Sequence, residues 1–339
     1  MTTGRPKVAP PPSEMVTPPA PAPSSSNFVK RHAVLSFYAL TFAISWIGML
    51  VIIGGPRNVP GTSAQVEQLF LPAIVAWLAG PSIASIVLTG FVDGRVGYRT
   101  LIARLLKWRV SWRWYAVALL GAPLMYVTVV LVLSLTSAEF MPGILITGDR
   151  SGLLLMGLGY GLLGGGFLEE LGWTGFAVPR VRQRYSILHT GLLVGLLWGA
   201  YHFSIIYWSG SHPGALGLTI LLLQLFAWLP AYRILMVWVY DHTESLLVAM
   251  LMHASLTAGM LILQPVAMAG VTLLVWLLAF AAAWWVVVAV VAAANRRQLS
   301  RKAHAVLASV SGQSMSGRSE DDRGGLFIRL GEAGLTFPM

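Results

Sequence analysis

The sequence contains no cysteine among its 339 residues and has few charged residues. Without cysteine, the chain can use neither disulfides nor thiolate chemistry. Charged residues make up 11% of the sequence, against about 25% in a typical soluble protein. Hydrophobic residues make up 56%, and 13 tryptophans and 10 tyrosines are suited to the aromatic belts of membrane interfaces. The composition therefore predicts an all-α polytopic membrane protein.

Both ends of the chain lack the long apolar runs of the middle. Residues 1–31 are rich in Pro, Ser and Ala and have no apolar core of the kind found in a secretory signal. We therefore expect a disordered N-terminal tail over 1–31. The sequence turns polar again at residue 295, which predicts a second disordered tail over 295–339. The membrane domain is expected over 32–294, and the sequence shows no internal repeat.

The middle of the chain has enough apolar sequence for eight membrane spans. A transmembrane helix needs about 20 mostly apolar residues. Stretches of this kind occur at 33–54, 69–92, 115–135, 152–178, 187–208, 215–239, 245–264 and 270–294. We therefore expect a bundle of about eight transmembrane helices.

Positive charges are concentrated in alternate connections. The net charge is +10, but the Lys and Arg residues lie between the apolar stretches, which favours contact with anionic lipid over nucleic-acid binding. With eight spans, the Lys/Arg-rich connections share one side, and Arg57 and Arg150 are the exceptions. The positive-inside rule then predicts a multi-pass protein of the cytoplasmic membrane with both termini in the cytoplasm. Segment 99–114, with cations and tryptophans around apolar residues at helical spacing, is expected to be an interfacial amphipathic helix.

Two adjacent glutamates, Glu169 and Glu170, lie inside the fourth apolar stretch. A carboxylate at bilayer depth is costly unless it is protonated, paired or facing a wet cavity, so it indicates a functional site. Taken alone, the pair suits the proton site of a transporter about as well as a catalytic site. Transport is disfavoured because the sequence shows neither repeats nor paired broken helices.

Two histidines in other stretches are candidate partners of the glutamates. Residues four apart share a helix face, as do Trp198 and His202 in the fifth stretch and His253 and Thr257 in the seventh. At about 1.5 Å per residue, Glu169 lies roughly 14 Å, His253 roughly 12 Å and His202 roughly 22 Å from the cytoplasmic ends of their stretches. A tilted helix or a later start of the fifth stretch would bring all three to a similar depth.

Carboxylates and imidazoles in a low-dielectric cavity are suited to activating water. A glutamate can act as general base toward water, and an imidazole can hold that water or donate to a developing oxyanion. Glu169, His202 and His253 can equally bind a divalent metal such as zinc, with one position left for water. The sequence leaves both a metal-dependent and a metal-free hydrolysis open.

Three strings, in order on three apolar stretches, resemble a known family. EELGWTGFAVPR, WGAYHF and HASLT are similar to the motifs Glu-Glu-x-x-x-Arg, Phe-x-x-x-His and His-x-x-x-Asn of the CPBP intramembrane proteases, the type II CAAX prenyl endopeptidases or lysostaphin resistance protein A-like proteins. The resemblance covers about 150–260. It implies a CAAX-protease-like helical bundle that hydrolyses peptide bonds of a membrane-embedded or lipidated, for example prenylated, protein substrate.

The resemblance also implies a role for each matching residue. Glu169 would be the general base, with His202 holding the water. His253 would stabilise the oxyanion of the tetrahedral intermediate, and Glu170 would support the site by positioning a histidine. The family is classed as metalloendopeptidase, which implies a metal bound by Glu169, His202 and His253.

The chain departs from the family pattern at three supporting positions. Trp198 stands in place of Phe, Thr174 in place of Arg, and Thr257 in place of Asn. A Thr257 hydroxyl can donate one hydrogen bond to an oxyanion, whereas Thr174 supplies no cation, for which Arg180 is the nearest substitute in the sequence. These departures keep open an alternative in which the chain is a catalytically weak or inactive bacteriocin-immunity or scaffold protein.

Overall fold

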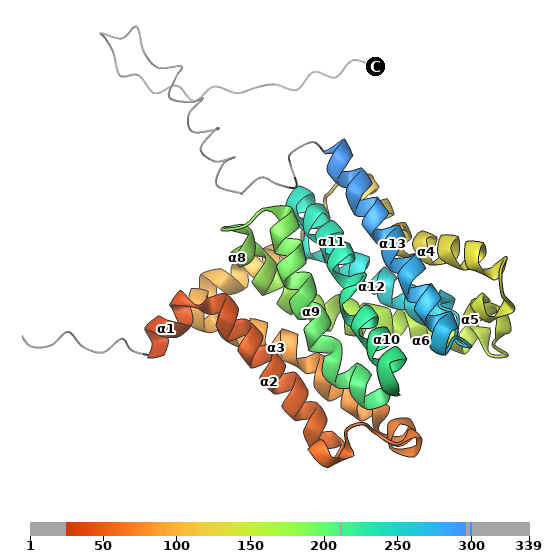
Figure 1. Cartoon of the computed structure of the whole chain (residues 1–339). Helices are drawn as coiled ribbons and strands as arrows, with labels where there is room; N and C mark the ends of the chain where they lie inside the picture. Colours follow the sequence, from red (N-terminus) through yellow and green to blue (C-terminus); the bar gives the residue numbers. More distant parts are fainter. Residues whose placement is uncertain (1–24, 211, 296–298, 300–339) are drawn as a thin grey trace, which may run out of the picture.

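The computed structural model describes residues 25–210, 212–295 and 299, and the regular structure within these residues is entirely helical (Figure 1). The first three spans are α2 (Ala33–Ile52), α3 (Ser63–Leu105) and α4 (Trp112–Ser134). The fourth runs through α6 (Arg150–Tyr160), η3 (Gly161–Glu169), α7 (Glu170–Gly172), η4 (Trp173–Ala177) and α8 (Val178–Arg182). The others are α9 (Ile187–Ser209), α10 (Gly214–Phe226) with α11 (Leu229–Thr243), α12 (Leu246–Leu263) and α13 (Gly270–Ala294).

These elements make eight segments that are long and apolar enough to cross a membrane, which confirms the predicted number of spans. Figure 1 shows α2 and α3 on one flank of the bundle and α4 and α13 on the other, with α9, α11 and α12 between them. Short helices occupy the connections and the N-terminal side, namely α1 (Ser25–Arg31), η1 (Pro56–Asn58), η2 (Ala138–Phe140) and α5 (Gly143–Ile146).

The connections meet at two opposite ends of the bundle. At one end, which we call the basic end, Lys107 pairs with Glu244 at 3.0 Å and Arg182 pairs with Asp241 at 2.8 Å. At the other, the Lys/Arg-poor end, the Gly61 amide donates to the Trp208 carbonyl at 2.9 Å. The Gly61 bond places the connection 53–62 at this second end. The connections 135–149 and 264–269 lie beside each other, because the Gly143 amide donates to the Gln264 carbonyl. The helices therefore alternate in direction as the charge pattern predicts.

Two segments differ from the sequence predictions. The expected N-terminal tail over 1–31 includes α1, which begins at Ser25 and contacts α2 and α3, whereas 1–24 lie outside the described residues. The expected interfacial helix over 99–114 is shorter than predicted. A kink at Gly94 (φ 60°) divides α3, the helical segment after this kink ends at Leu105, and residues 106–111 are not helical before α4 begins. The positive φ of Gly94 allows this turn without the strain that a side chain would add. Of the C-terminal tail, only Asn295 and Leu299 are described.

The fourth and sixth spans are interrupted, which the sequence analysis did not anticipate. In the sixth, α10 ends at Phe226 and α11 begins at Leu229, next to Pro230, which has no backbone N–H to continue the ladder. The indole of Trp285 donates to the Ala227 carbonyl at 2.8 Å and so satisfies one group freed by the break. In the fourth, the segments η3 and η4 are π-helical, a form that is rare and occurs mostly at functional sites.

The glycine run of the fourth span brings that span close to α12. A side chain at Gly161 would place its Cβ 2.6 Å from the Ala254 carbonyl oxygen, and one at Gly165 would lie 2.9 Å from the His253 ring. These glycines are therefore required for the approach of the two spans, because small residues let helix backbones pack closely.

Candidate active site

The structure brings the predicted site residues together in the middle of the bundle. Glu169 ends η3 and Glu170 begins α7, while His202 lies on α9 and His253 on α12. Glu169, His202 and His253 line one cavity of about 290 Å³, together with Trp198 and Thr257. The cavity size is near the lower limit of about 300–1,000 Å³ that is usual for ligand pockets.

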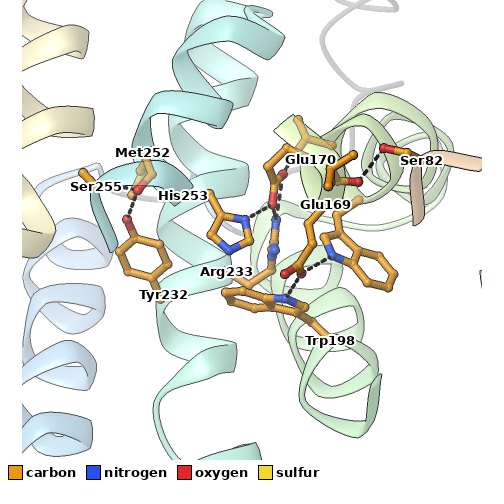
Figure 2. A network of polar contacts seen from close by, with 12 residues as sticks. Ser82, Glu169, Glu170, Trp198, Tyr232, Arg233, Met252, His253 and Ser255 are labelled. Atoms are coloured by element: carbon orange, nitrogen blue, oxygen red, sulfur yellow. Dashed lines mark hydrogen bonds and ion pairs between the residues drawn. The ribbon is translucent and has the colours of Figure 1, made fainter. Parts of the chain in front are cut away.

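Glu169 is held by two tryptophans. Its Oε2 accepts hydrogen bonds from the indole N–H groups of Trp173, at 2.9 Å, and Trp198, at 2.8 Å (Figure 2). Both indoles donate to Oε2, so the second oxygen, Oε1, is not engaged by them. Glu169 also lines the cavity. The replacement of the family's Phe by Trp198 is therefore more than a change of ring size, because a phenyl group cannot donate this bond.

Glu170 is completely buried and sits within a charged network. Its Oε1 accepts from Arg233 Nη1 at 2.9 Å and from His253 Nδ1 at 2.7 Å. Its Oε2 accepts from the same Arg233 nitrogen at 3.0 Å and from the Thr174 hydroxyl. We assign a proton to Nδ1 of His253, because a carboxylate oxygen only accepts. Nε2 of His253 then lies on the other side of the ring, beside Gly165 in the cavity wall.

Arg233, on α11, is the site residue that the sequence analysis missed. It is fully buried, and its guanidinium carbon stacks 4.2 Å from the centroid of the Trp198 ring. A charged residue inside an apolar stretch is the signal that identified the glutamates, and it also applies to Arg233, which is the single charged residue inside the predicted span 215–239. Figure 2 shows Arg233 between His253 and the glutamates, below Glu170.

His202 is oriented by the backbone of its own helix. Its Nδ1 lies 2.8 Å from the Trp198 carbonyl and donates to it, which leaves Nε2 as the acceptor of a neutral ring. The ring also contacts Trp77 edge-on, with 4.9 Å between centroids. Trp198 touches both imidazoles, with centroids 5.6 Å from His202 and 4.9 Å from His253.

The supporting residues divide between the site and the basic end. Thr174 donates to Glu170 and Thr257 lines the cavity. Arg180 does not supply the cation missing at Thr174, because it forms an ion pair with Asp93 and lies over the Phe176 ring at the basic end. Arg180 therefore does not take the place of the family's arginine, because its guanidinium pairs with Asp93 instead of with Glu170. Arg233 reaches Glu170 from a different helix instead.

The expected metal site requires Glu169, His202 and His253 to lie within reach of one ion. Among the described residues, no three His, Asp or Glu side chains are grouped closely enough to hold a metal ion. This arrangement does not fit a three-ligand metal site, so no step below is routed through a metal.

Comparison with known proteins agrees with the motifs. Residues 150–259 match the family of type II CAAX prenyl endopeptidases described as Rce1-like. A stretch of 44 residues is 39% identical to CAAX prenyl protease 2 of Methanococcus maripaludis, covering 13% of this chain and 16% of that protein. Residues 150–259 include Glu169, Glu170, His202, Arg233 and His253. The chain is a polytopic all-α membrane protein whose residues 150–259 match the Rce1-like type II CAAX prenyl endopeptidases.

Proposed function

We propose that the chain is an intramembrane endopeptidase of the cell membrane in which Glu169 activates water against a peptide bond. The observation that carries this proposal is the convergence of Glu169, His202 and His253 on one cavity, with the Glu169 carboxylate held by two indoles. The family match supports a CAAX-type endopeptidase in general.

The proposed step uses only groups of this chain. A water molecule bound between Glu169 Oε1 and His202 Nε2 gives a proton to Glu169 as its oxygen bonds to the carbonyl carbon. The C=O electron pair moves onto the carbonyl oxygen, which is stabilised by a protonated His253 Nε2–H and by the Thr257 hydroxyl. Glu169 then passes its proton to the peptide nitrogen as the C–N bond breaks, which yields an amine and a carboxylic acid.

Glu170, Arg233 and Thr174 are positioning residues in this proposal. The Glu170 carboxylate fixes the tautomer and the ring orientation of His253, in the way that the aspartate of a hydrolase triad orients its histidine. Arg233 pairs with Glu170 and stacks on Trp198, which donates a hydrogen bond to Glu169. The same cation therefore helps to hold both glutamates in place. This contact supplies the positive charge that Thr174 lacks, which argues against the non-catalytic alternative.

The proposed substrate is a membrane protein that reaches the site by lateral diffusion, with a lipidated C-terminus or a transmembrane segment at the scissile bond. The proposed mechanism is metal-free, although the family class implies a metal. Metal analysis of purified protein, together with hydrolysis in the presence of a chelator, tests this point. Loss of activity on chelation that returns with zinc would require a rearranged donor set.

The function is tested by comparing wild type with Glu169→Gln in membranes. Cleavage of prenylated CAAX peptides and of the host membrane proteome is followed, and Glu67→Gln serves as the control because Glu67 is exposed at the Lys/Arg-poor end. We expect Glu169→Gln to lower turnover by about 10²–10⁴-fold, the usual contribution of a general base, and Glu67→Gln to leave it unchanged. Equal product patterns from all three proteins would reject the protease and favour an immunity, scaffold or transport role.

A further inference from the structure

The active-site cavity extends in one direction only. On α9 its lining residues begin at Trp198 and continue through Ile205 to Ser209, the last residue of that helix. On α12 they begin at His253 and continue to Met260, again toward the Lys/Arg-poor end. The cavity therefore extends from the catalytic groups to the end of the bundle that carries few cations.

Toward the basic end the fourth span is closed. Every residue from Glu169 to Val178 is buried, so packed side chains separate the catalytic groups from that face. A second, polar cavity of about 740 Å³ lies at the basic end, lined by ion pairs such as Arg182 with Asp241. In the described part of the chain, the two cavities share no lining residue. Among the described residues, neither of these two cavities connects the basic end with Glu169.

The wall of the active-site cavity reaches the lipid-facing surface. Phe70 on α3 is 42% exposed and Met260 on α12 is 37% exposed, and both line the cavity. Both residues lie in the half of their helices next to the Lys/Arg-poor end, seven residues after Ser63 and three before Leu263. A chain within the bilayer can therefore enter from the side, in that half of the membrane.

The cavity also contains one hydrogen-bond donor and one acceptor that are unused. The Trp77 indole N–H and the Gln224 side-chain oxygen are buried, and neither has a hydrogen-bond partner among the described residues. Both residues line the cavity, from α3 and α10 respectively. An extended peptide offers carbonyl and amide groups that need such partners, because unpaired backbone groups are costly in a dry environment. An intact helix, in contrast, satisfies these groups internally.

We propose that the substrate is a locally unwound transmembrane segment whose scissile bond lies in the half of the membrane next to the Lys/Arg-poor end, which the charge pattern assigns to the non-cytoplasmic half. Trp77 donates to a backbone carbonyl of this segment and Gln224 accepts from a backbone N–H. This inference rests on the proposed peptidase function and selects one substrate class within it. A lipidated C-terminus that approaches from the cytoplasmic face is the class it disfavours.

The inference is tested by mapping new peptide termini in cells that express the full chain, with the Glu169→Gln variant as the reference. We expect termini that depend on Glu169 to lie inside transmembrane segments, in the non-cytoplasmic half. Termini at the cytoplasmic C-terminal ends of lipidated proteins would overturn the inference while leaving the peptidase function intact. No Glu169-dependent termini would reject the peptidase function, and the inference with it.

Orientation is measured in the same cells. The chain has no cysteine, so Arg57→Cys and Arg184→Cys each introduce a single thiol at an exposed position on opposite ends of the bundle. A membrane-impermeant maleimide added outside the cells should label Arg57→Cys and spare Arg184→Cys. The reverse labelling would place the cavity mouth in the cytoplasmic half and overturn the inference.

The spare hydrogen-bond groups are tested by Gln224→Leu and Trp77→Phe, with Thr219→Val as the control. Thr219 lies on the same helix as Gln224, is exposed and bonds only to its own helix. We expect each cavity variant to raise KM for a cleaved transmembrane segment about tenfold, with kcat changed less, because uniform binding is lost. Unchanged KM in both folded variants would remove the backbone-binding role.

Discussion

Glu169 and Glu170 are neighbours in the sequence, but their surroundings have little in common. Glu169 receives two bonds from neutral indoles on one oxygen and borders a cavity. Glu170 is fully buried, with both oxygens engaged by a cation, an imidazole and a hydroxyl. Adjacent residues on a helix point about 100° apart, which is enough to direct one carboxylate to the cavity and the other into the protein.

This difference separates a reactive group from a structural one. A general base needs an accessible lone pair, which the Oε1 atom of Glu169 can supply from the cavity wall. A buried carboxylate whose partners occupy both oxygens is suited to holding other groups in place. Each of the following variants weakens one of the two environments. Equal effects of the two kinds of variant on stability and on turnover would mean that the two glutamates do not have separate roles.

The largest effect is expected from Arg233→Met, which removes the cation beside Glu170. Removal of one partner of a buried ion pair costs about 3–5 kcal/mol, because the remaining charge stays buried without compensation. Thermal unfolding in detergent should therefore show strong destabilisation. The double variant Glu170→Gln/Arg233→Met removes both charges and should recover most of the loss. Equal destabilisation of the single and double variants would mean that Arg233 acts through packing on Trp198 alone.

Trp198→Phe weakens the other environment and should act on turnover more than on stability. The phenyl ring keeps the aromatic contacts with both histidines but loses the N–H that orients Glu169. We expect kcat to fall about 10- to 100-fold, by analogy with the loss of one preorganised donor, which costs about 10²–10³ at an oxyanion. Trp285→Phe, which removes an indole bond to the Ala227 carbonyl and leaves both bonds to Glu169 intact, is the control and should retain turnover. Unchanged kcat in Trp198→Phe would show that Trp173 alone orients Glu169.

The spans and the glutamate pair were predictable because a single local signal reports them. The length of an apolar stretch predicts a membrane span, and a carboxylate such as Glu169 inside that stretch indicates a functional site. The same rule points to Arg233, whereas the spacing of the motif points to a cation on the motif's own helix, such as Arg180. A partner that arrives from another helix depends on tertiary packing, which spacing along the chain does not encode.

The interruptions of the spans were not predictable from hydropathy. The window over 215–239 has Arg233 as its single charged residue and is mostly apolar, so its mean hydropathy does not show the break before Pro230. The π-helical η3 segment likewise has the sequence of a flexible, glycine-rich helix. In both cases the energy that decides the geometry comes from contacts with neighbouring helices, such as the Trp285 bond to Ala227.

Gly161→Ala tests whether close packing of the fourth span sets the distance between Glu169 and His253. The added Cβ would lie 2.6 Å from the Ala254 carbonyl oxygen, so η3 or α12 has to move. Overpacking of this kind costs about 1–3 kcal/mol, and turnover should fall with stability because the cavity is formed between these two elements. Gly159→Ala is the matched control, since nothing lies within 4 Å of its added Cβ. Equal thermal stability and turnover of the two variants would show that close packing at Gly161 does not determine the geometry of the site.

The smallest effect is expected at Thr257, which stands where the family has Asn. Its hydroxyl lies on the cavity wall and can donate one bond to the oxyanion that forms after attack by the water that Glu169 activates. Thr257→Asn should raise kcat by a few-fold, on the order of 1 kcal/mol for a better-aimed donor, whereas Thr257→Val should lower kcat by a similar factor. Both changes leave the Glu170 network intact, so the unfolding temperature should move little. Lower or unchanged turnover in a folded Thr257→Asn variant would exclude Thr257 as the oxyanion donor and leave His253, held by Glu170, as the group that stabilises the intermediate.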